Sequence, residues 1–101
     1  MRLLIDDFRT MTEVDHTART ARDGQEFLKK NYVTHLYIDH DLGGLITGYD
    51  IINWALYVDL CPPNVMILSD NPVGRDNIVR ALVNHGYERK GHWYRENILC
   101  D

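Results

Sequence analysis

The amino-acid sequence predicts a single α/β domain whose sheet is mainly parallel. Three short apolar runs, at residues 3–5, 36–38 and 65–68, each stop at polar residues. This is typical of strands that are buried on both faces. Stretches with apolar residues at helical spacing lie between the later runs. The length of 101 residues corresponds to one domain, and a composition that is 45% hydrophobic and 26% charged is ordinary for a globular protein.

The first expected strand, residues 3–5, stops at Asp6 and Asp7. Residues 14–21 carry small, β-branched and polar side chains in alternation, which predicts a second, weaker strand. Only about eight residues separate the two strands, whereas a parallel crossover needs about a dozen or more. The second strand is therefore expected to be antiparallel, poorly formed, or reached by a bare loop.

The first expected helix begins at Asp23, where Glu26 three residues later completes a capping-box pattern, and it ends at about Lys30. The next apolar run, residues 36–38, is expected to be a strand. It ends in the acidic sequence Asp-His-Asp at residues 39–41.

The second half of the chain repeats the alternation of helix and strand. Apolar residues at helical spacing within residues 51–56 predict a helix that the prolines at 62–63 terminate. The apolar run 65–68 predicts a third buried strand, followed by a helix that begins near Gly74.

We expect Gly86 to follow the end of this helix as its C′ residue. Residues 87–94 are expected to form a strand or a hairpin that turns near Lys90 and Gly91.

Composition argues against several classes of partner. The net charge is −4 and no basic cluster exceeds the pair Arg89 and Lys90, so we expect no binding of duplex DNA. The apolar runs are too short for a signal peptide or a membrane span, so no membrane partner is expected. The lone thiols of Cys61 and Cys100 suit a reducing compartment, which predicts a cytoplasmic location.

Acidic residues follow two of the expected strands, and a hydroxyl group follows the third. Because the carboxyl ends of parallel strands share one edge of a sheet, Asp6, Asp7, Asp39 and Ser69 are expected to converge there. A divalent cation such as Mg²⁺ or Mn²⁺ relieves the repulsion between clustered carboxylates. The sequence therefore predicts a metal site of Asp6, Asp7 and Asp39. The alternative is that these acids only cap loops and helices.

The segment after the third apolar run has two interpretations. Ser69, Asn71 and the amide of Gly74 could bind a phosphate at the start of the following helix. The dipeptide Asn71-Pro72 is equally typical of an ordinary turn.

Two further side chains could take part in chemistry at this edge. His40 could act as a general acid or base oriented by Asp41, or it could be structural and point away from Asp39, because side chains alternate along a strand. Arg9 could bind phosphate oxygens or simply neutralise Asp7.

This pattern of acids and hydroxyl resembles the phospho-acceptor receiver domain of two-component signalling. The segment 20–26 also resembles the start of the second helix of receivers. Two parts of that family are missing, namely the helix between the first two strands and the lysine at the end of the fifth strand. The resemblance implies a flavodoxin-like, three-layer sandwich without its first crossover helix.

The chain is more closely similar to the cyclic-phosphate processing receiver domains. The motifs that carry this resemblance are Asp6-Asp7-x-Arg9, Asp39-His40-Asp41-Leu42-Gly43, Thr47-Gly48-x-Asp50 and Ser69-x-Asn71-Pro72-x-Gly74-Arg75. Leu68 stands where that family usually has a histidine before the serine. Short members of this kind resemble bacterial and phage accessory proteins.

The resemblance implies binding, and metal-assisted hydrolysis, of a cyclic phosphate on an RNA end or a nucleotide. In this interpretation Asp6, Asp7 and Asp39 hold the metal, while Ser69, Asn71, Gly74 and Arg75 bind the phosphate. His40, Asp41 and Arg9 are the expected catalytic residues. One alternative is a non-catalytic module that sequesters a phosphorylated ligand or binds a partner protein. The other is a phospho-acceptor receiver with Asp39 as the acceptor.

Overall fold

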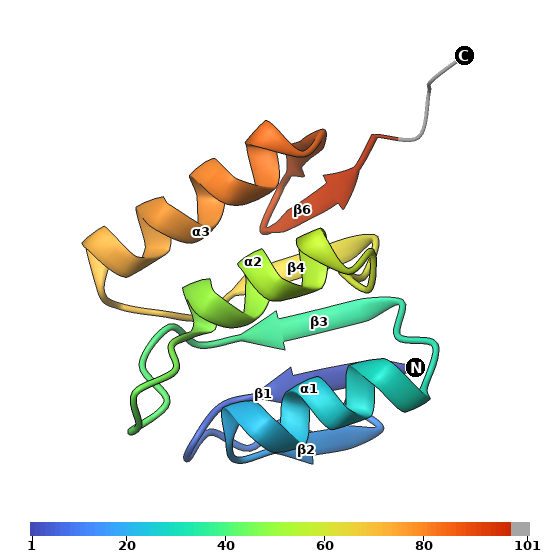
Figure 1. The fold of residues 1–101 in the computed structure, drawn as a ribbon, viewed down its shortest axis with the longest axis vertical. Coiled ribbons are helices and arrows are strands. Elements are labelled where there is room, and N and C mark those ends of the chain that lie inside the picture. Colours follow the sequence, from blue (N-terminus) through green and yellow to red (C-terminus); the bar gives the residue numbers. More distant parts are fainter. Residues whose placement is uncertain (98–101) are drawn as a thin grey trace.

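The computed structural model describes residues 1–97, which form one mixed sheet covered by helices (Figure 1). The strands, in their order across the sheet, are β2 (His16–Ala18), β1 (Arg2–Ile5), β3 (His35–Ile38), β4 (Asn64–Ile67), β6 (Trp93–Glu96) and β5 (Tyr87–Lys90). The helices are α1 (Ala21–Lys30), α2 (Gly48–Tyr57) and α3 (Pro72–Asn84). The predicted α/β class with a mainly parallel sheet is confirmed, because β2, β1, β3 and β4 are parallel. Cys100 lies outside the described residues.

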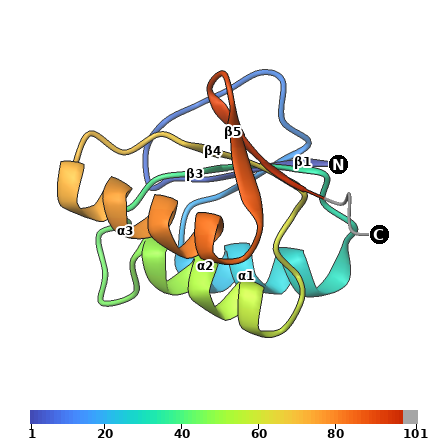
Figure 2. The ribbon, with the colours of Figure 1, turned by 90° about the horizontal axis from the view of Figure 1, so that it is seen from above.

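All three helices of residues 1–97 lie on one face of the sheet, as Figure 2 shows from above. The chain moves in one direction across the sheet from β2 to β3 and from β3 to β4. Right-handed crossovers therefore place α1 and α2 on the same face. The step from β1 to β2 runs the other way, but it carries no helix. The described residues thus form two layers rather than the expected three-layer sandwich, while the receiver-like connectivity is retained.

The second strand is short and parallel, and it is reached by a bare loop of residues 6–15. Leu4 of β1 pairs with Thr17 of β2, and the backbone and side chain of Asp15 bond to the backbone of Arg2. The alternative of an antiparallel strand is therefore wrong. The loop of residues 6–15 is therefore long enough to return the chain to the start of a parallel neighbour without a helix.

The helices begin at different residues from those expected. Thr20, not Asp23, is the N-cap of α1, and its hydroxyl accepts a hydrogen bond from the Asp23 amide. Asp23 occupies the third helical position, where the helix dipole stabilises its negative charge. The predicted end at Lys30 is confirmed.

The third helix starts two residues before Gly74, because Asn71 caps it and Pro72 occupies its first position. Gly86 follows the C-cap with φ of 91°, as expected of a C′ glycine. The predicted hairpin is also confirmed, with Gly91 at its turn and φ of 66°.

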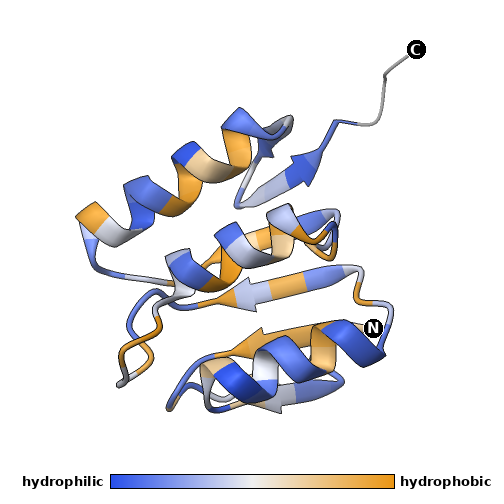
Figure 3. Ribbon diagram, viewed as in Figure 1, coloured by the Kyte–Doolittle hydropathy of each residue, from blue (hydrophilic) through white to orange (hydrophobic). Residues whose placement is uncertain are grey.

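The core lies between the sheet and the helices. Alternate strand residues point toward the helices, and in β1, β3 and β4 the buried side chains of this set are Leu3, Ile5, Leu36, Ile38, Val65 and Ile67. Figure 3 shows this as apolar segments on the strands and on one side of the helices. No helix within residues 1–97 has the length and apolarity needed to cross a membrane.

The opposite face of the sheet is covered without helices. The loop of residues 6–15 arches over this face in Figure 2. Leu4, which points to this face because Leu3 and Ile5 point to the helices, is fully buried. Tyr37 is 4% exposed, accepts a hydrogen bond from Arg2 Nη1 at 2.8 Å and packs against the ring of Trp93. The loop therefore takes the place of the missing helix.

Replacing Gly48 with alanine is expected to destabilise the fold by roughly 1–3 kcal/mol. A methyl group at Gly48 would overlap the backbone carbonyl of Asp39, which is not free to move as a flexible side chain is. The Gly48 amide also donates to the carbonyl of His40 at 2.8 Å, so the two segments are held in contact. Urea denaturation measures the change.

Gly44→Ala is the matched control for Gly48→Ala. A methyl group at Gly44 would meet no atom within 4 Å, so this variant should stay within about 0.5 kcal/mol of the parent. Equal stabilities of the two variants would contradict the close contact between α2 and the residue after β3.

Candidate functional site

Three carboxylates converge at the edge of the sheet where β1 and β3 end. Ile5 pairs with Ile38, so the residues that follow them, Asp6 and Asp39, lie side by side. One oxygen from each of Asp6, Asp7 and Asp39 lies within 4.8 Å of the others. Asp6 is fully buried, Asp39 is 6% exposed, and Asp7 is open to solvent. The structure thus brings together the three acids that the sequence assigns to a metal.

Arg9 spans this acidic cluster. Its Nη1 atom lies 2.8 Å from Asp6 Oδ2 and 3.4 Å from Asp39 Oδ2, and its Nη2 atom lies 3.7 Å from Asp70 Oδ2. These ion pairs join Arg9 to Asp6, Asp39 and Asp70, whereas the sequence suggests Asp7 as the partner. Asp70 is a neighbour that the sequence does not assign to the site, because the contact joins segments far apart in the chain.

Hydrogen bonds stabilise the charged form of Asp6. Burial alone would raise the pKa of Asp6, but its Oδ1 atom accepts from the amides of Arg9 and Phe8 at 2.9 and 3.0 Å. Together with the Arg9 guanidinium, these bonds hold the pKa of Asp6 below its ordinary value. Asp6 is therefore a fixed anion at neutral pH.

Asp39 has the opposite shift. Burial, together with the charge of Asp6, raises the pKa of Asp39 above its ordinary value, and Arg9 offsets this only in part. Asp39 therefore has a carboxylate that a further cation would stabilise. Three converging carboxylate oxygens suit hard divalent cations, so the donor set fits Mg²⁺ or Mn²⁺.

His40 lies on the other side of the strand. Leu36 and Ile38 face the helices, and His40 continues this alternation and packs on α3. A methyl group at Gly74 would overlap the imidazole ring. The side chain of His40 is 13% exposed, and its Nδ1 atom lies 3.1 Å from Asp41 Oδ1. The expected pairing of His40 with Asp41 is present, and the ring points away from Asp39.

The segment from Ser69 to Arg75 forms the cap of α3. Ser69 Oγ accepts from the Asn71 amide at 3.0 Å, and Asn71 Oδ1 accepts from the amides of Val73 and Gly74, each at 3.1 Å. Arg75 Nη1 donates to the carbonyl of Ile67 at 2.9 Å. The Gly74 amide is therefore engaged by the cap, whereas the Ser69 hydroxyl hydrogen and the Asn71 side-chain amide are polar groups that a ligand could use.

Leu68 occupies a position beside the acidic cluster. Ile67 pairs with Ile38, so Leu68 lies next to Asp39, one residue further along neighbouring strands. The alternation of side chains places Leu68 and Asp39 on the same face of the sheet. The leucine that replaces the usual histidine of this family therefore lies directly beside the acidic cluster.

Two lysines lie away from this edge, and the third, Lys90, lies at the carboxyl end of β5, which β6 separates from β4 and the acidic cluster. Lys29 and Lys30 are in the last turn of α1, and Lys90 lies at the end of β5, where it pairs with Glu88 at 3.6 Å. The strand next to β4 is the antiparallel β6. The position from which receivers present their lysine is therefore occupied by a different element.

The comparisons with known proteins agree with the resemblance seen in the motifs. The model of the family described as "Cyclic-phosphate processing Receiver domain" matches residues 1–84. This range includes β1 to α3 and every candidate site residue that the sequence predicts. No curated protein matches the chain.

Asp39→Asn is expected to stabilise the metal-free protein at neutral pH by on the order of 0.5–2 kcal/mol. Because the pKa of Asp39 is raised in the native state, the native state holds this proton more strongly than the unfolded chain. Stability is then lost as pH rises from the ordinary pKa of the carboxyl through its raised value. The asparagine side chain removes that loss. Urea denaturation with EDTA at pH 7 and pH 3.5 measures it.

The gain from Asp39→Asn should be larger at pH 7 than at pH 3.5, where the parent carboxyl is largely protonated. Asp70→Asn is the control, because the Asp70 side chain is 99% exposed and its stability change should stay within about 0.5 kcal/mol. A loss of stability in Asp39→Asn at pH 7 would show that burial and the charge of Asp6 do not destabilise the Asp39 carboxylate.

Proposed function

This chain belongs to the cyclic-phosphate processing receiver domain family, and on that premise we propose that its acidic edge binds a divalent cation and the cyclic phosphate of an RNA end or a nucleotide. The observation that carries the proposal is the convergence of Asp6, Asp7 and Asp39 within 4.8 Å. Asp39 supports it further, because its charge is only partly offset by Arg9. We also propose that the bound ring is hydrolysed.

Asp6, Asp7 and Asp39 would hold Mg²⁺ or Mn²⁺ in this proposal. A bound divalent cation supplies a Lewis acid for a phosphoryl oxygen and lowers the pKa of a water molecule. Asp6 is held in place by the backbone of the loop through Oδ1, and its Oδ2 atom, which now pairs with Arg9, would face the cation. Asp7 is exposed and adds the oxygen that is most easily reoriented.

Arg9 would balance charge during the reaction. Its guanidinium contacts Asp6, Asp39 and Asp70, so it lies across the cluster with N–H donors directed at more than one partner. When Asp39 gains another cation as its partner, the donors of Arg9 become available for phosphate oxygens. The guanidinium then stabilises charge that develops on the phosphate.

His40 and Asp41 would handle the proton. Asp41 accepts from Nδ1 of the ring, which leaves Nε2 unprotonated in the neutral imidazole and able to act as a base. Ser69 and Asn71 would bind the phosphate through their remaining hydrogens. Gly74 and Arg75 would contribute after giving up part of their present hydrogen bonds, to Asn71 and to Ile67 respectively.

A second candidate function is a module that binds a phosphorylated ligand without turnover. Two observations favour it. Leu68 places an apolar side chain beside Asp39 where the family usually has an imidazole. His40, in turn, faces α3 on the other side of the sheet. A bound cyclic phosphate would then be retained rather than opened.

Mg²⁺ is expected to raise the melting temperature of the parent protein, because a ligand that binds only the native state stabilises it. At a concentration of about one hundred times Kd the gain is about 2.7 kcal/mol. Asp39→Asn should abolish the increase, and Asp70→Asn should retain it. An equal increase in Asp39→Asn would place the metal elsewhere. Thermal denaturation with and without EDTA makes the measurement.

Turnover is tested with a 2′,3′-cyclic nucleotide and Mg²⁺, with calorimetry for binding and chromatography for the product. His40→Ala should lower the rate by about 10²–10⁴ with little change in affinity, as expected of a proton-transfer residue. If the parent binds the nucleotide and never consumes it, and Leu68→His gains no activity, the non-catalytic module is the function. If the parent binds neither the cyclic nucleotide nor an RNA oligonucleotide with a 2′,3′-cyclic phosphate end, cyclic-phosphate binding is wrong.

A further inference from the structure

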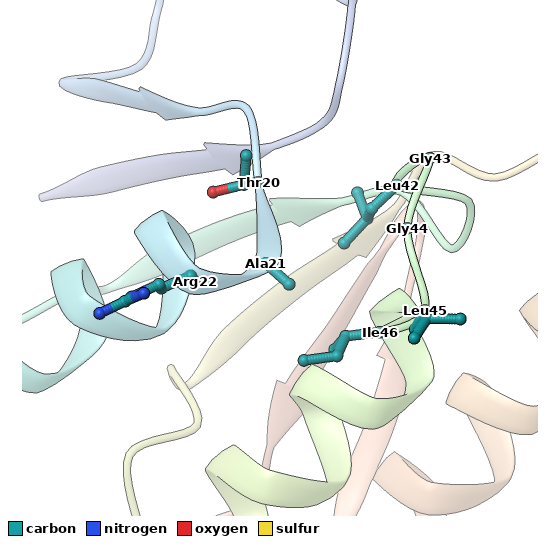
Figure 4. A pocket seen from close by; sticks show the side chains of 8 residues that line it. All are labelled: Thr20, Ala21, Arg22, Leu42, Gly43, Gly44, Leu45 and Ile46. Carbon is teal, nitrogen blue, oxygen red and sulfur yellow. The ribbon is translucent and has the colours of Figure 1, made fainter.

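A cavity of about 300 Å³ lies beside the acidic cluster, between the start of α1 and the loop of residues 42–46 (Figure 4). Ala21 of α1 and the side chains of Leu42 and Ile46 point into the space between the two segments, whereas Arg22 and Leu45 point away from it. The inward-pointing side chains are all apolar, and no charged side chain among the residues lining the cavity points inward. The cavity therefore suits a neutral, largely apolar group.

The cavity and the acidic cluster share a wall. Gly43 lines the cavity, and a Cβ atom on it would lie 3.4 Å from Asp7 Oδ2. Gly43 has φ of 75°, a conformation that glycine adopts readily, so the loop turns here directly against the acid. A ligand with a phosphate at the cluster would thus have its next group within reach of the cavity.

The loop of residues 42–46 is open enough to admit a flat group. A Cβ atom on Gly44 would meet nothing within 4 Å, and Leu45 is fully exposed beside it. Phe8, which follows the acids after β1, is 72% exposed. Phe8 therefore places an exposed apolar side chain directly after the acids.

The geometry points to a nucleobase as the occupant of this cavity, with the ribose cyclic phosphate of the same nucleotide at the acidic cluster. This inference rests on the proposed function and names its substrate class. A base is a flat ring with apolar faces and a polar edge. Leu42 and Ile46 would contact its face, and the backbone of Gly43 and Gly44 would meet its edge. The volume is at the lower end of that of small-ligand sites.

The experiment compares two probes in calorimetry with Mg²⁺, a 2′,3′-cyclic nucleotide and the ribose 2′,3′-cyclic phosphate that lacks a base. The parent should bind the nucleotide roughly tenfold or more tightly, because only the nucleotide buries apolar surface in the cavity. Ile46→Ala should weaken binding of the nucleotide by roughly five- to thirtyfold and leave the base-free probe unchanged.

Leu45→Ala is the matched control, since it removes the same number of atoms from a neighbouring side chain that points away from the cavity. It should leave both affinities unchanged. Ala21→Leu fills the cavity from the opposite wall and should remove the preference for the nucleotide. Circular dichroism confirms that each variant is folded.

The outcomes separate this inference from the function on which it rests. Equal affinities of the parent for the two probes, or an Ile46→Ala variant that binds the nucleotide as the parent does, would overturn the nucleobase site while leaving cyclic-phosphate binding intact. Failure of both probes to bind would overturn the proposed function and the inference together.

Discussion

The buried carboxylate of Asp6 is the constraint around which the acidic edge is arranged. A fully buried anion is unfavourable unless hydrogen bonds and a countercharge compensate it. The chain meets this requirement locally, with the amides of Phe8 and Arg9 on one oxygen and the Arg9 guanidinium on the other. The loop after β1 is therefore fixed where it leaves the sheet. Asp39 lies beside Asp6 because of strand register, and it shares the same arginine with less compensation. The same cluster therefore stabilises the charged form of Asp6 and leaves the charge of Asp39 only partly compensated.

The same loop accounts for the departure from three layers. In this strand order, only the connection from β1 to β2 would place a helix on the second face, and the chain makes that connection with residues 6–15. The loop then has two functions, because its first residues compensate Asp6 and its remainder arches over the second face of the sheet. Shortening this loop would expose the second face of the sheet and would also remove the hydrogen bonds that hold the carboxylate of Asp6. The structure and the site are coupled through this segment.

The features that follow from local patterns could be predicted from the sequence, and those that depend on contacts between distant segments could not. The strands that end at Asp6 and Asp39 were evident because an apolar run that stops at an acid has one simple explanation in a parallel sheet. The predicted start of α1 was wrong because Thr20 and Asp23 are both good N-cap residues. Each has an acidic residue three positions later, so the capping pattern fits the sequence at either residue. The contacts of Arg9 with Asp39 and Asp70 join separate strand ends, so no spacing in the sequence reveals them. The number of layers was missed because it depends on the direction of each crossover across the sheet.

Strand alternation divides the site into two halves with different chemistry. Asp6, Asp39 and Leu68 lie on the face covered by the loop, and His40 lies on the face covered by α3. A histidine at position 68 would place an imidazole next to the acids, on the side where a metal would be held. With leucine at position 68, the imidazole near this edge is that of His40. This ring lies on the helix side of the sheet, so it would have to reach a ligand over the ends of the strands. A cyclic phosphate bound at the acids can meet this ring only if its scissile bond extends over the ends of β3 and β4 toward α3. The position of the ligand along that edge, more than the presence of the acids, therefore decides between hydrolysis and retention.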